Sequence, residues 1–534
     1  MSQRPRLFDF NDERESIVEE TAARVFDEKL ALAKADPTKR LEYVLNEAAF
    51  RELERLTQYG ADHEIGEIGS FGFWRGLAKR ARSAGEGEKK RALKRLLSAY
   101  SGDIAGNFDP KVYQFANQVL PLGLSLLFNT QRGSGLSFRK LSERIKIEGD
   151  IDRLKRLSSK GTLIVAPTHL SNLDSIVLGW ALAESGLPPV TYGAGKNLFT
   201  NKLLTFFMQN LGAYKVDRRI KHGLYKSCLK AYSEVLLERG FHSLFFPGGT
   251  RSRSGEVEQK LKLGLLGTGL TAYVRHLKAG RERKMFVVPV TLNFNLVLEA
   301  EGLVKDYLKA VGKEYFLLPD DPFDSPFEVA RFATKLASME TSMVIRFGEP
   351  LDILGHNVDE EGRSYDGSGR EVDLPRFFEL DNGEIGLSKA RDRIYTRQAG
   401  EALCRAFARN TVLMPTQFVS YVLFEAARRQ FPNLKLAQVM RFAQDLQIPW
   451  SEVNADAANL QREVKRAVFR GEVRALEPLL SKSAPELVDI GLRALNMYHS
   501  KPPVEATGQG ARLGNMELLY YYSNRLRVLP EFAE

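Results

Sequence analysis

The sequence of 534 residues contains only two cysteines, Cys228 and Cys404, which lie far apart along the chain. Two distant cysteines form neither a disulfide framework nor a zinc motif, and this scarcity is typical of a reducing compartment. The chain also lacks a run of about 18 uninterrupted apolar residues, so we expect no transmembrane helix. Its first residues carry charges where a signal peptide needs an apolar core. Together these absences favour a cytoplasmic protein.

Signatures of nucleic-acid binding are missing as well. The sequence has no zinc knuckle, RNA-recognition signature or long basic tail, so nucleic acid is not the favoured partner. Lys and Arg number 77 against 67 Asp and Glu, a formal net charge of +10. An excess of this sign suits anionic lipid headgroups or a phosphorylated substrate. Nothing in the sequence indicates the oligomeric state.

The pattern of apolar residues divides the chain into four parts. Residues 1–135 and 393–534 show helical periodicity and predict helical N-terminal and C-terminal domains. Within 136–350, short β-branched runs alternate with helical segments, which predicts an α/β sheet domain. Residues 351–392 are rich in Gly, Asp and Glu, and we interpret them as a polar linker or excursion.

The expected strands and helices of the sheet domain follow from these runs. The strands are predicted at Thr162–Pro167, Val190–Ala194, Ser243–Phe246 and Phe286–Leu292. The helices are predicted at Ser175–Ala183, Tyr225–Arg239 and Leu263–Leu277. In α/β domains, ligands bind in the loops beyond the strand ends, so the reactive side chains are expected there.

An aromatic and basic segment lies within the N-terminal part. It contains Phe71, Phe73 and Trp74, followed by many Lys and Arg residues. One interpretation is a solvated helical hairpin that turns at Gly85–Gly87. The other is an interfacial segment, with the aromatic rings in lipid and the cations on phosphates.

The first candidate for chemistry is the sequence THLSNLD, which follows the strand TLIVAP. A regular helix would place His169 and Asp174 about 140° apart, so a turn is needed for them to meet. We expect Ser171 or Asn172 to cap the next helix and to supply that turn. The carboxylate would then hydrogen-bond one imidazole nitrogen and leave the other as a base. The alternative is a structural histidine, because this spacing often arises by chance.

Three further features follow in order: GAYKVDRR from Gly212, FFPGGTRSRSG from Phe245, and the strand Val287–Val290 with its proline. Small residues in the second let the backbone approach a ligand, and Arg251 and Arg253 are forked donors suited to phosphate. A solvated basic loop and a core or edge strand are the plainer interpretations of the second and third features.

The four features, in this order, resemble the four sequence blocks of the glycerolipid acyltransferase superfamily. The blocks correspond to H-x4-D, to Gly212, Val216 and Arg218, to FPGGTRS, and to the V-P-V strand. The resemblance implies a mixed sheet flanked by helices. It also implies direct acyl transfer from acyl-CoA or acyl carrier protein, without an acyl-enzyme, a cofactor or a metal. It implies the catalytic residues His169 and Asp174 and the substrate-binding residues Arg218, Gly249, Thr250, Arg251, Ser252 and Arg253.

Within the superfamily, the ending RSRSG, the stretch NFNLVLEAEGLVKDYL with Glu299, and the segment ARNTVLMPTQFVSYVLFEAAR are similar to bacterial glycerol-3-phosphate acyltransferases. This similarity implies acylation of the sn-1 hydroxyl of glycerol 3-phosphate in phospholipid synthesis, by a peripheral protein on the inner face of the cell membrane. The Val-Asp-Arg of the second block is more similar to the compact enzymes, so 1-acylglycerol-3-phosphate is the alternative acceptor. A non-catalytic lipid-binding relative is a third possibility.

One departure from the family pattern lies in the third block. The family has a glutamate where this chain has Gly248. We expect Glu256 or Glu258 to take its place, or the acceptor to differ. Other enzyme classes are not favoured, because the chain has no G-x-S-x-G motif, and GAGKN at Gly193 lacks the first glycine and final Ser or Thr of a phosphate loop.

Overall fold

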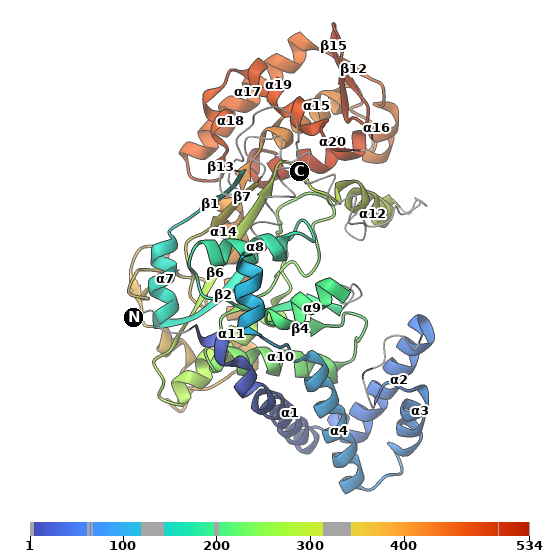
Figure 1. The fold of residues 1–534 in the computed structure, drawn as a ribbon, viewed down its shortest axis with the longest axis vertical. Helices are drawn as coiled ribbons and strands as arrows, with labels where there is room; N and C mark the ends of the chain where they lie inside the picture. The colour runs from blue at the N-terminus through green and yellow to red at the C-terminus, as the bar shows by residue number, and fades with distance from the viewer. Residues whose placement is uncertain are drawn as a thin grey trace.

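The computed structural model describes residues 5–60, 65, 68–118, 144–196, 202–312, 343–499 and 501–532. Three parts follow one another along the long axis of the molecule (Figure 1): N-terminal helices at one end, the sheet in the middle and C-terminal helices at the other end. No helix among these residues is both long and apolar enough to cross a bilayer.

A seven-stranded sheet forms the centre of the molecule. Its strands in chain order are β1 (Ile145–Glu148), β2 (Gly161–Pro167), β3 (Thr191–Gly195), β4 (Ala213–Val216), β5 (Ser243–Leu244), β6 (Lys284–Phe294) and β7 (Met343–Phe347). In space their order is β1-β7-β6-β2-β5-β3-β4. The five strands from β6 to β4 are parallel, whereas β7 is antiparallel to β6 and parallel to β1. The predicted mixed sheet is therefore confirmed, although the third predicted strand is shorter than expected.

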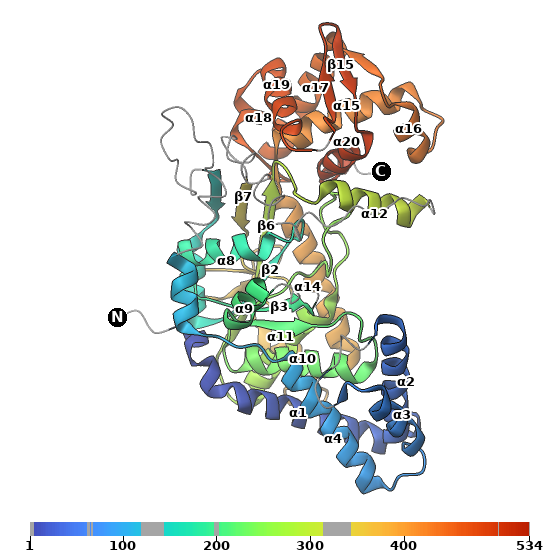
Figure 2. The same ribbon diagram turned by 45° about the vertical axis from the view of Figure 1, so that its right-hand side comes forward.

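Helices connect the strands. They are α7 (Ile151–Lys160), α8 (Asp174–Glu184), α9 (Lys202–Asn210), α10 (Gly223–Glu238), α11 (Leu263–Lys278) and α12 (Ala300–Gly312). Every residue of β2 is buried, which explains its continuous apolar sequence. Leu163 and Val165 belong to the core under α7 and α8, whereas Ile164 and Ala166 belong to the core under α11 and α14 (Lys389–Asn410). Both faces of the sheet are thus covered, with α14 in orange behind it in Figure 2.

Pro289 lies inside β6, between two neighbouring strands. A proline has no N–H to donate and is normally restricted to edges or bulges. Val290 is paired with Phe347, but Val287 is paired with Leu351, so the register changes by one residue between these pairs. Pro289 therefore sits at a bulge, where the missing donor does not break the ladder.

Among the described residues, the helices that precede the sheet include α1 (Phe10–Ala35), α2 (Leu41–Tyr59), α3 (Phe71–Arg80) and α4 (Glu86–Ile104), with the short helices η1 (Arg6–Asp9) and η2 (Pro37–Lys39) beside α1. Their core continues into α10 of the sheet domain. Trp74 is only 1% exposed and fills this core, so the interfacial interpretation is wrong for this ring. The hairpin interpretation describes the segment better, because α3 ends before a turn and α4 begins just after Gly85.

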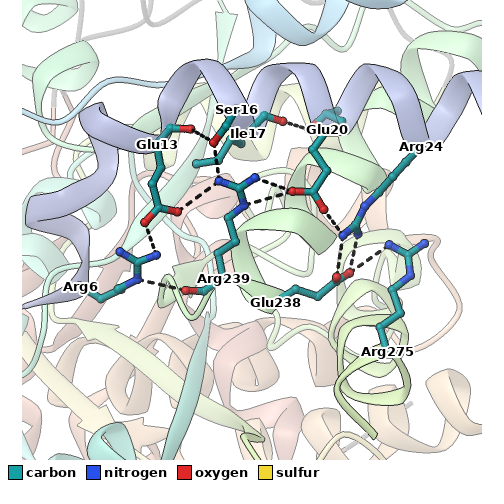
Figure 3. A network of polar contacts seen from close by, with 10 residues as sticks. Arg6, Glu13, Ser16, Ile17, Glu20, Arg24, Glu238, Arg239 and Arg275 are labelled. Carbon is teal, nitrogen blue, oxygen red and sulfur yellow. Dashed lines mark hydrogen bonds and ion pairs between the residues drawn. The ribbon is translucent and has the colours of Figure 1, made fainter. Parts of the chain in front are cut away.

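An ion-pair network holds α1 against α10 and α11 (Figure 3). The carboxylate of Glu238 accepts two hydrogen bonds from Arg24, at 2.6 and 2.7 Å, and one from Arg275 at 3.0 Å. Arg239 reaches back to Glu20 on α1. Because the groups are only partly exposed and share partners, they restrain one another more than an isolated surface pair would.

Residues 351–392 fold onto the sheet domain. They contain β8 (Asn357–Val358), β9 (Ser364–Tyr365), β10 (Glu371–Val372) and the short helix η7 (Leu374–Phe378). The turns between these elements are polar, but Ile353 and Phe378 are buried in the core shared with α11 and α14. The polar composition therefore reflects exposed turns on a segment that is anchored at both ends.

The C-terminal part contains the helices α15 (Pro415–Gln430), α16 (Leu436–Phe442), α17 (Trp450–Phe469), α18 (Glu477–Ser481), α19 (Ala484–Leu495), α20 (Met516–Ser523), η8 (Asn524–Val528) and η9 (Pro530–Phe532). Short strands lie between them: β11 (Val412–Leu413), β12 (Gln447–Pro449), β13 (Arg474–Ala475), β14 (Val504–Ala506) and β15 (Gly510–Leu513). This part is joined to the end of β6, because Gln417 donates to the carbonyl of Phe294 and Thr416 to that of Asn295.

Candidate active site

His169 and Asp174 meet in the turn between β2 and α8. The imidazole Nδ1 lies 2.8 Å from Oδ2 of Asp174. The aspartate side chain is fully buried, whereas the histidine side chain is 15% exposed. One ring nitrogen is therefore occupied by a carboxylate, and the ring itself borders a pocket that opens to solvent.

The carboxylate of Asp174 also builds the turn. Its Oδ2 accepts hydrogen bonds from the backbone N–H groups of Leu170, at 2.6 Å, and Ser171, at 2.9 Å. The expected capping of α8 by Ser171 or Asn172 is wrong, since no side chain caps this helix, but Ser171 does help to form the turn: its hydroxyl accepts the N–H of Leu173 at 3.1 Å. Ser171 has another role: its hydroxyl donates to Glu299.

Glu299 lies just beyond β6 and is almost fully buried. It accepts hydrogen bonds from the Ser171 hydroxyl at 2.8 Å, from the Asn172 N–H at 2.9 Å and from Arg251 at 3.2 Å. One carboxylate thus ties the turn after β2 to the loop after β5. The sequence singled out Glu299 through the family resemblance alone, and its position explains why an acid is needed there.

The loop after β5 encloses the histidine from the other side. The ring of Phe246 stacks on that of His169, with centroids 4.1 Å apart. The Ser252 N–H donates to the carbonyl of His169 at 2.8 Å, and its hydroxyl donates to the carbonyl of Glu256. Gly249 has φ +77° and its N–H bonds the Phe246 carbonyl in a tight turn. Gly249 and Ser252 therefore shape the loop.

Glu258 occupies the space beside Gly248. A Cβ atom added to Gly248 would lie 3.1 Å from Cγ of Glu258 and 3.4 Å from its Oε1. That same Oε1 accepts the backbone N–H of His169 at 2.7 Å. Of the two acids expected to compensate for Gly248, Glu258 is the one whose side chain contacts the histidine backbone. Glu256 contributes its carbonyl, which accepts from Ser252.

The C-terminal segment completes the surroundings of Glu258. Arg525 of η8 is 2% exposed and donates to the carbonyls of Leu292, at 3.4 Å, and Glu256, at 3.5 Å. Burial raises the pKa of Glu258, and the positive charge of Arg525 opposes part of that rise. Nothing in the sequence pattern signals Arg525, because it reaches the site from 356 residues beyond His169 only through the fold.

The segment fits closely against the loop. Gly255 has φ +84°, and a Cβ there would lie 2.0 Å from the carbonyl oxygen of Tyr521. Asn524 donates to the carbonyl of Ser254 at 2.8 Å. The loop after β5 therefore takes its shape partly from residues near the end of the chain.

A pocket of about 190 Å³ lies in front of His169. Arg218, Thr250, Arg251 and Arg253 line it together with the histidine. These four are the predicted substrate-binding residues that the structure brings to the pocket. The lining is cationic on one side, which suits a phosphorylated ligand.

The arginines of the pocket differ in how they are held. Arg251 is anchored by Glu299, whereas Arg218 and Arg253 have exposed side chains. Partial desolvation and the nearby charge of Arg251 lower the pKa of Arg218 from its ordinary value. Among the described residues that line the pocket, Asp306 on α12 is the only carboxylate. A bound molecule would thus meet two unanchored guanidinium groups and one acid.

The described residues contain no group of three or more His, Cys, Asp or Glu side chains placed to hold a metal ion. What the arrangement offers is proton transfer at the free imidazole nitrogen and anion binding at the arginines.

Comparison with known proteins identifies the central region. The family model Acyltransferase matches residues 145–293, which contain all four sequence blocks. The glycerol-3-phosphate acyltransferase of Pseudomonas paraeruginosa is 26% identical over 255 residues, 48% of this chain and 27% of that protein. The enzyme of the same name from Actinobacillus succinogenes is 31% identical over 221 residues, 41% of this chain and 25% of that protein.

The chain thus spans about a quarter of the length of these relatives. Among solved structures, a 1-acyl-sn-glycerophosphate acyltransferase from Thermotoga maritima is 15% identical, with a TM-score of 0.26. The alignment covers 59% of this chain and 88% of that one.

Substitutions at positions 248 and 258 test whether the two side chains compete for the same space. Gly248→Glu should lower the thermal midpoint, because the new side chain must displace Glu258 from the His169 N–H. In the double variant Gly248→Glu with Glu258→Ala, at least half of the lost thermal midpoint should be recovered. Gly248→Ala is the control for added bulk without added charge. A second measurement concerns Glu258→Ala alone: the amide hydrogens of residues 168–174 should exchange faster, since a lost hydrogen bond to a charged acceptor costs about 1.5–3 kcal/mol. Equal thermal midpoints for wild type, Gly248→Glu and the double variant would contradict this assignment.

Proposed function

We propose that residues 145–293, which match the Acyltransferase family model, form a glycerolipid acyltransferase domain, and that the protein transfers a fatty acyl group from a thioester to a hydroxyl of a glycerol-phosphate-type acceptor. The observation that carries the proposal is the 2.8 Å contact of His169 with buried Asp174, at a pocket lined by three arginines. A binding protein has no need of such a base beside its anion site.

The reaction follows from the protonation states of the histidine. Asp174 accepts a hydrogen bond from Nδ1–H, which fixes the tautomer and leaves Nε2 unprotonated as the base. Nε2 takes the proton of the acceptor hydroxyl while that oxygen attacks the thioester carbonyl. The tetrahedral intermediate then collapses, the C–S bond breaks, and the imidazolium returns its proton to the leaving thiolate. The products are an ester and a free thiol, with no covalent bond to the protein.

Arg218, Arg251 and Arg253 hold the acceptor phosphate in this proposal. Fixing the phosphate positions the hydroxyl beside His169 and removes orientational entropy from the reaction. Asp306 accepts a hydrogen bond from the hydroxyl that is not acylated. Glu299 and Glu258 act through the turn: they hold the backbone of residues 169–172, so we assign them positioning roles.

The acceptor we propose is glycerol 3-phosphate, acylated at its sn-1 hydroxyl in phospholipid synthesis, with acyl-CoA or acyl carrier protein as donor. The names of the relatives support this choice, as does the small pocket volume of about 190 Å³. The alternative acceptor is 1-acylglycerol 3-phosphate. Met208 and Leu303, which also line the pocket, favour it because they offer an apolar wall to an acyl chain.

His169→Ala should slow acyl transfer by about 10²- to 10⁴-fold, the usual contribution of a general base. Asp174→Asn should also be severe, because the amide cannot hold the same imidazole tautomer. Thiol release from acyl-CoA measures the rate. Calorimetric binding of glycerol 3-phosphate to His169→Ala and an unchanged thermal midpoint serve as controls. Near-normal turnover in His169→Ala would remove this histidine from the mechanism. Failure of wild type to release thiol with any acceptor would favour the non-catalytic relative.

Arg253→Lys and Arg218→Lys should each raise the acceptor KM by about 10-fold or more, because lysine cannot provide a forked pair of donors. The donor KM should stay unchanged. Arg376→Lys is the matched control, since Arg376 is 77% exposed and pairs with Asp373 outside the pocket. A rise confined to the donor KM would reverse the assignment. The same assay with both acceptors on wild type decides between glycerol 3-phosphate and its 1-acyl form.

We also propose that the protein binds peripherally to the inner face of the cell membrane, through an exposed aromatic patch near the pocket. Phe206 on α9 is 50% exposed and lies two residues before Met208, which lines the pocket. Phe115 is 52% exposed and stacks parallel to Phe207 beside it. Aromatic rings at this site would enter the interface, and the net charge of +10 would favour anionic lipid.

Phe115→Ser with Phe206→Ser should therefore reduce cosedimentation with vesicles that contain phosphatidylglycerol. Salt should weaken the binding of wild type, because exposed charges are screened beyond about 8 Å at physiological ionic strength. Phe469→Ser is the control, since that ring is 93% exposed on α17 in the C-terminal part. An equal loss in the control, or no loss in the double variant, would contradict the placement of the membrane face.

A further inference from the structure

A second and larger cavity lies on the α14 side of the sheet. Its volume is about 810 Å³, within the range of about 300–1,000 Å³ that is usual for small-molecule sites. Its walls come from residues 349–357, from the polar excursion at Tyr365 and Phe377, from α14 and from the segment Gly471–Arg474. None of the residues that surround His169 belongs to its described lining.

One face of α14 forms the floor. Residues that line the cavity recur three or four positions apart, which places them on a single side of the helix. They are Tyr395, Gln398, Ala402, Arg405, Ala406 and Arg409. The two alanines leave space in the middle of the floor. The helix thus presents an aromatic ring at one end and two guanidinium groups at the other.

The charges of the lining are unbalanced. Arg405 and Arg409 lie four residues apart on α14, an arrangement in which like charges repel. Arg474 of β13 joins them from the C-terminal part. The guanidinium groups of these three make no ion pair or hydrogen bond with any residue that the structure describes, although the backbone N–H of Arg474 donates to the carbonyl of Thr411. Their side chains are exposed and can therefore contact an anion that enters the cavity.

The other charged groups of the cavity have partners. Arg346 is held by Glu148 at 2.9 Å and by Asn410. Glu349 pairs with Arg153, and the Nδ1–H of His356 donates to the carboxylate of Asp352 at 2.9 Å. This hydrogen bond raises the pKa of His356. The one carboxylate of the lining is therefore already paired.

Aromatic side chains line the cavity at the Tyr395 end of the α14 face. Phe377 is 37% exposed, and its ring lies 6.0 Å from that of Tyr395 and 6.0 Å from that of His356. Exposed rings in a cavity provide a surface on which a planar group can stack. Because Tyr395 lies on the same helix face as the arginines, one molecule could contact both groups.

The frame of the cavity is rigid. Asp352 accepts the backbone N–H groups of Leu354, at 2.8 Å, and His356, at 3.0 Å. Gly355 has φ +96°, and a Cβ there would lie 2.6 Å from the Cβ of Ala402. The loop therefore packs directly on α14 and is held there by the hydrogen bonds of Asp352.

We propose that this cavity binds a nucleoside phosphate, with the phosphate groups on Arg405, Arg409 and Arg474 and the planar base against Tyr395 and Phe377. Inorganic phosphate would leave the aromatic side empty, and a phosphorylated glycerol would too. Only a ligand that combines several negative charges with a planar ring uses both ends of the cavity. The proposal does not depend on the transfer reaction at His169.

Calorimetric titration with ADP tests the proposal, with adenosine and inorganic phosphate as the two halves of the probe. ADP should bind to wild type more tightly than either half. Arg405→Gln with Arg409→Gln should weaken ADP at least about 10-fold, because two charge-assisted contacts are lost. Tyr395→Ala should weaken ADP but not inorganic phosphate. The arginine variant should fold normally, since it removes a repulsive pair.

Two controls separate this cavity from other cationic sites. Arg397→Gln changes a 65% exposed arginine on the same helix that pairs with Glu401 and does not line the cavity, so ADP affinity should be unchanged. Arg253→Gln alters the pocket at His169 and should also leave ADP affinity unchanged. Absence of ADP binding, or binding that the double arginine variant does not weaken, would overturn the proposal. Phosphate binding as tight as that of ADP would overturn the role of the rings.

Discussion

The hydrogen bonds accepted by the buried carboxylate of Asp174 determine the rest of the site. One oxygen accepts from the imidazole of His169 and from two backbone N–H groups, so it sets both the turn and the orientation of the ring. Two more carboxylates, Glu299 and Glu258, bind backbone N–H groups of the same turn. Burying three carboxylates next to one histidine costs free energy unless positive charges lie close to them. Arg251 and Arg525 supply that charge, the second from near the end of the chain.

This requirement explains how the chain can depart from its family at position 248. What the turn needs is an oxygen at the His169 N–H, and Glu258 provides it from ten residues further along the chain. The side chain of Glu258 fills the space that a residue larger than glycine would take. Glycine at position 248 thus leaves the space from which the carboxylate of Glu258 reaches the N–H of His169.

Much of the sheet domain could be predicted from the sequence. The fully buried β2 has an uninterrupted apolar run, and the histidine directly after it marks the edge where function concentrates. The hydrogen-bond partners of individual side chains were harder to predict, because they depend on the tertiary structure. Ser171 was expected as a cap, but its hydroxyl oxygen accepts the N–H of Leu173 before the helix, while its O–H donates to a buried glutamate that lies 128 residues further along the chain. Trp74 was open to two interpretations, since an aromatic residue on an amphipathic helix suits a core as well as a membrane.

The helical regions on either side of the matched domain are parts of the same structure. Gly106, just after α4, lies so close to β4 that a Cβ would be 2.6 Å from the carbonyl oxygen of Ala213. The N–H of Gly212 donates to the carbonyl of Asn107, so the N-terminal part meets the edge of the sheet. Arg218, which lines the pocket, follows β4 at that edge by two residues. At the opposite side, η8 carries Arg525 to Glu258. Because both ends of the chain support the loops around His169, residues 145–293 contain the chemistry but depend on their flanks for its geometry.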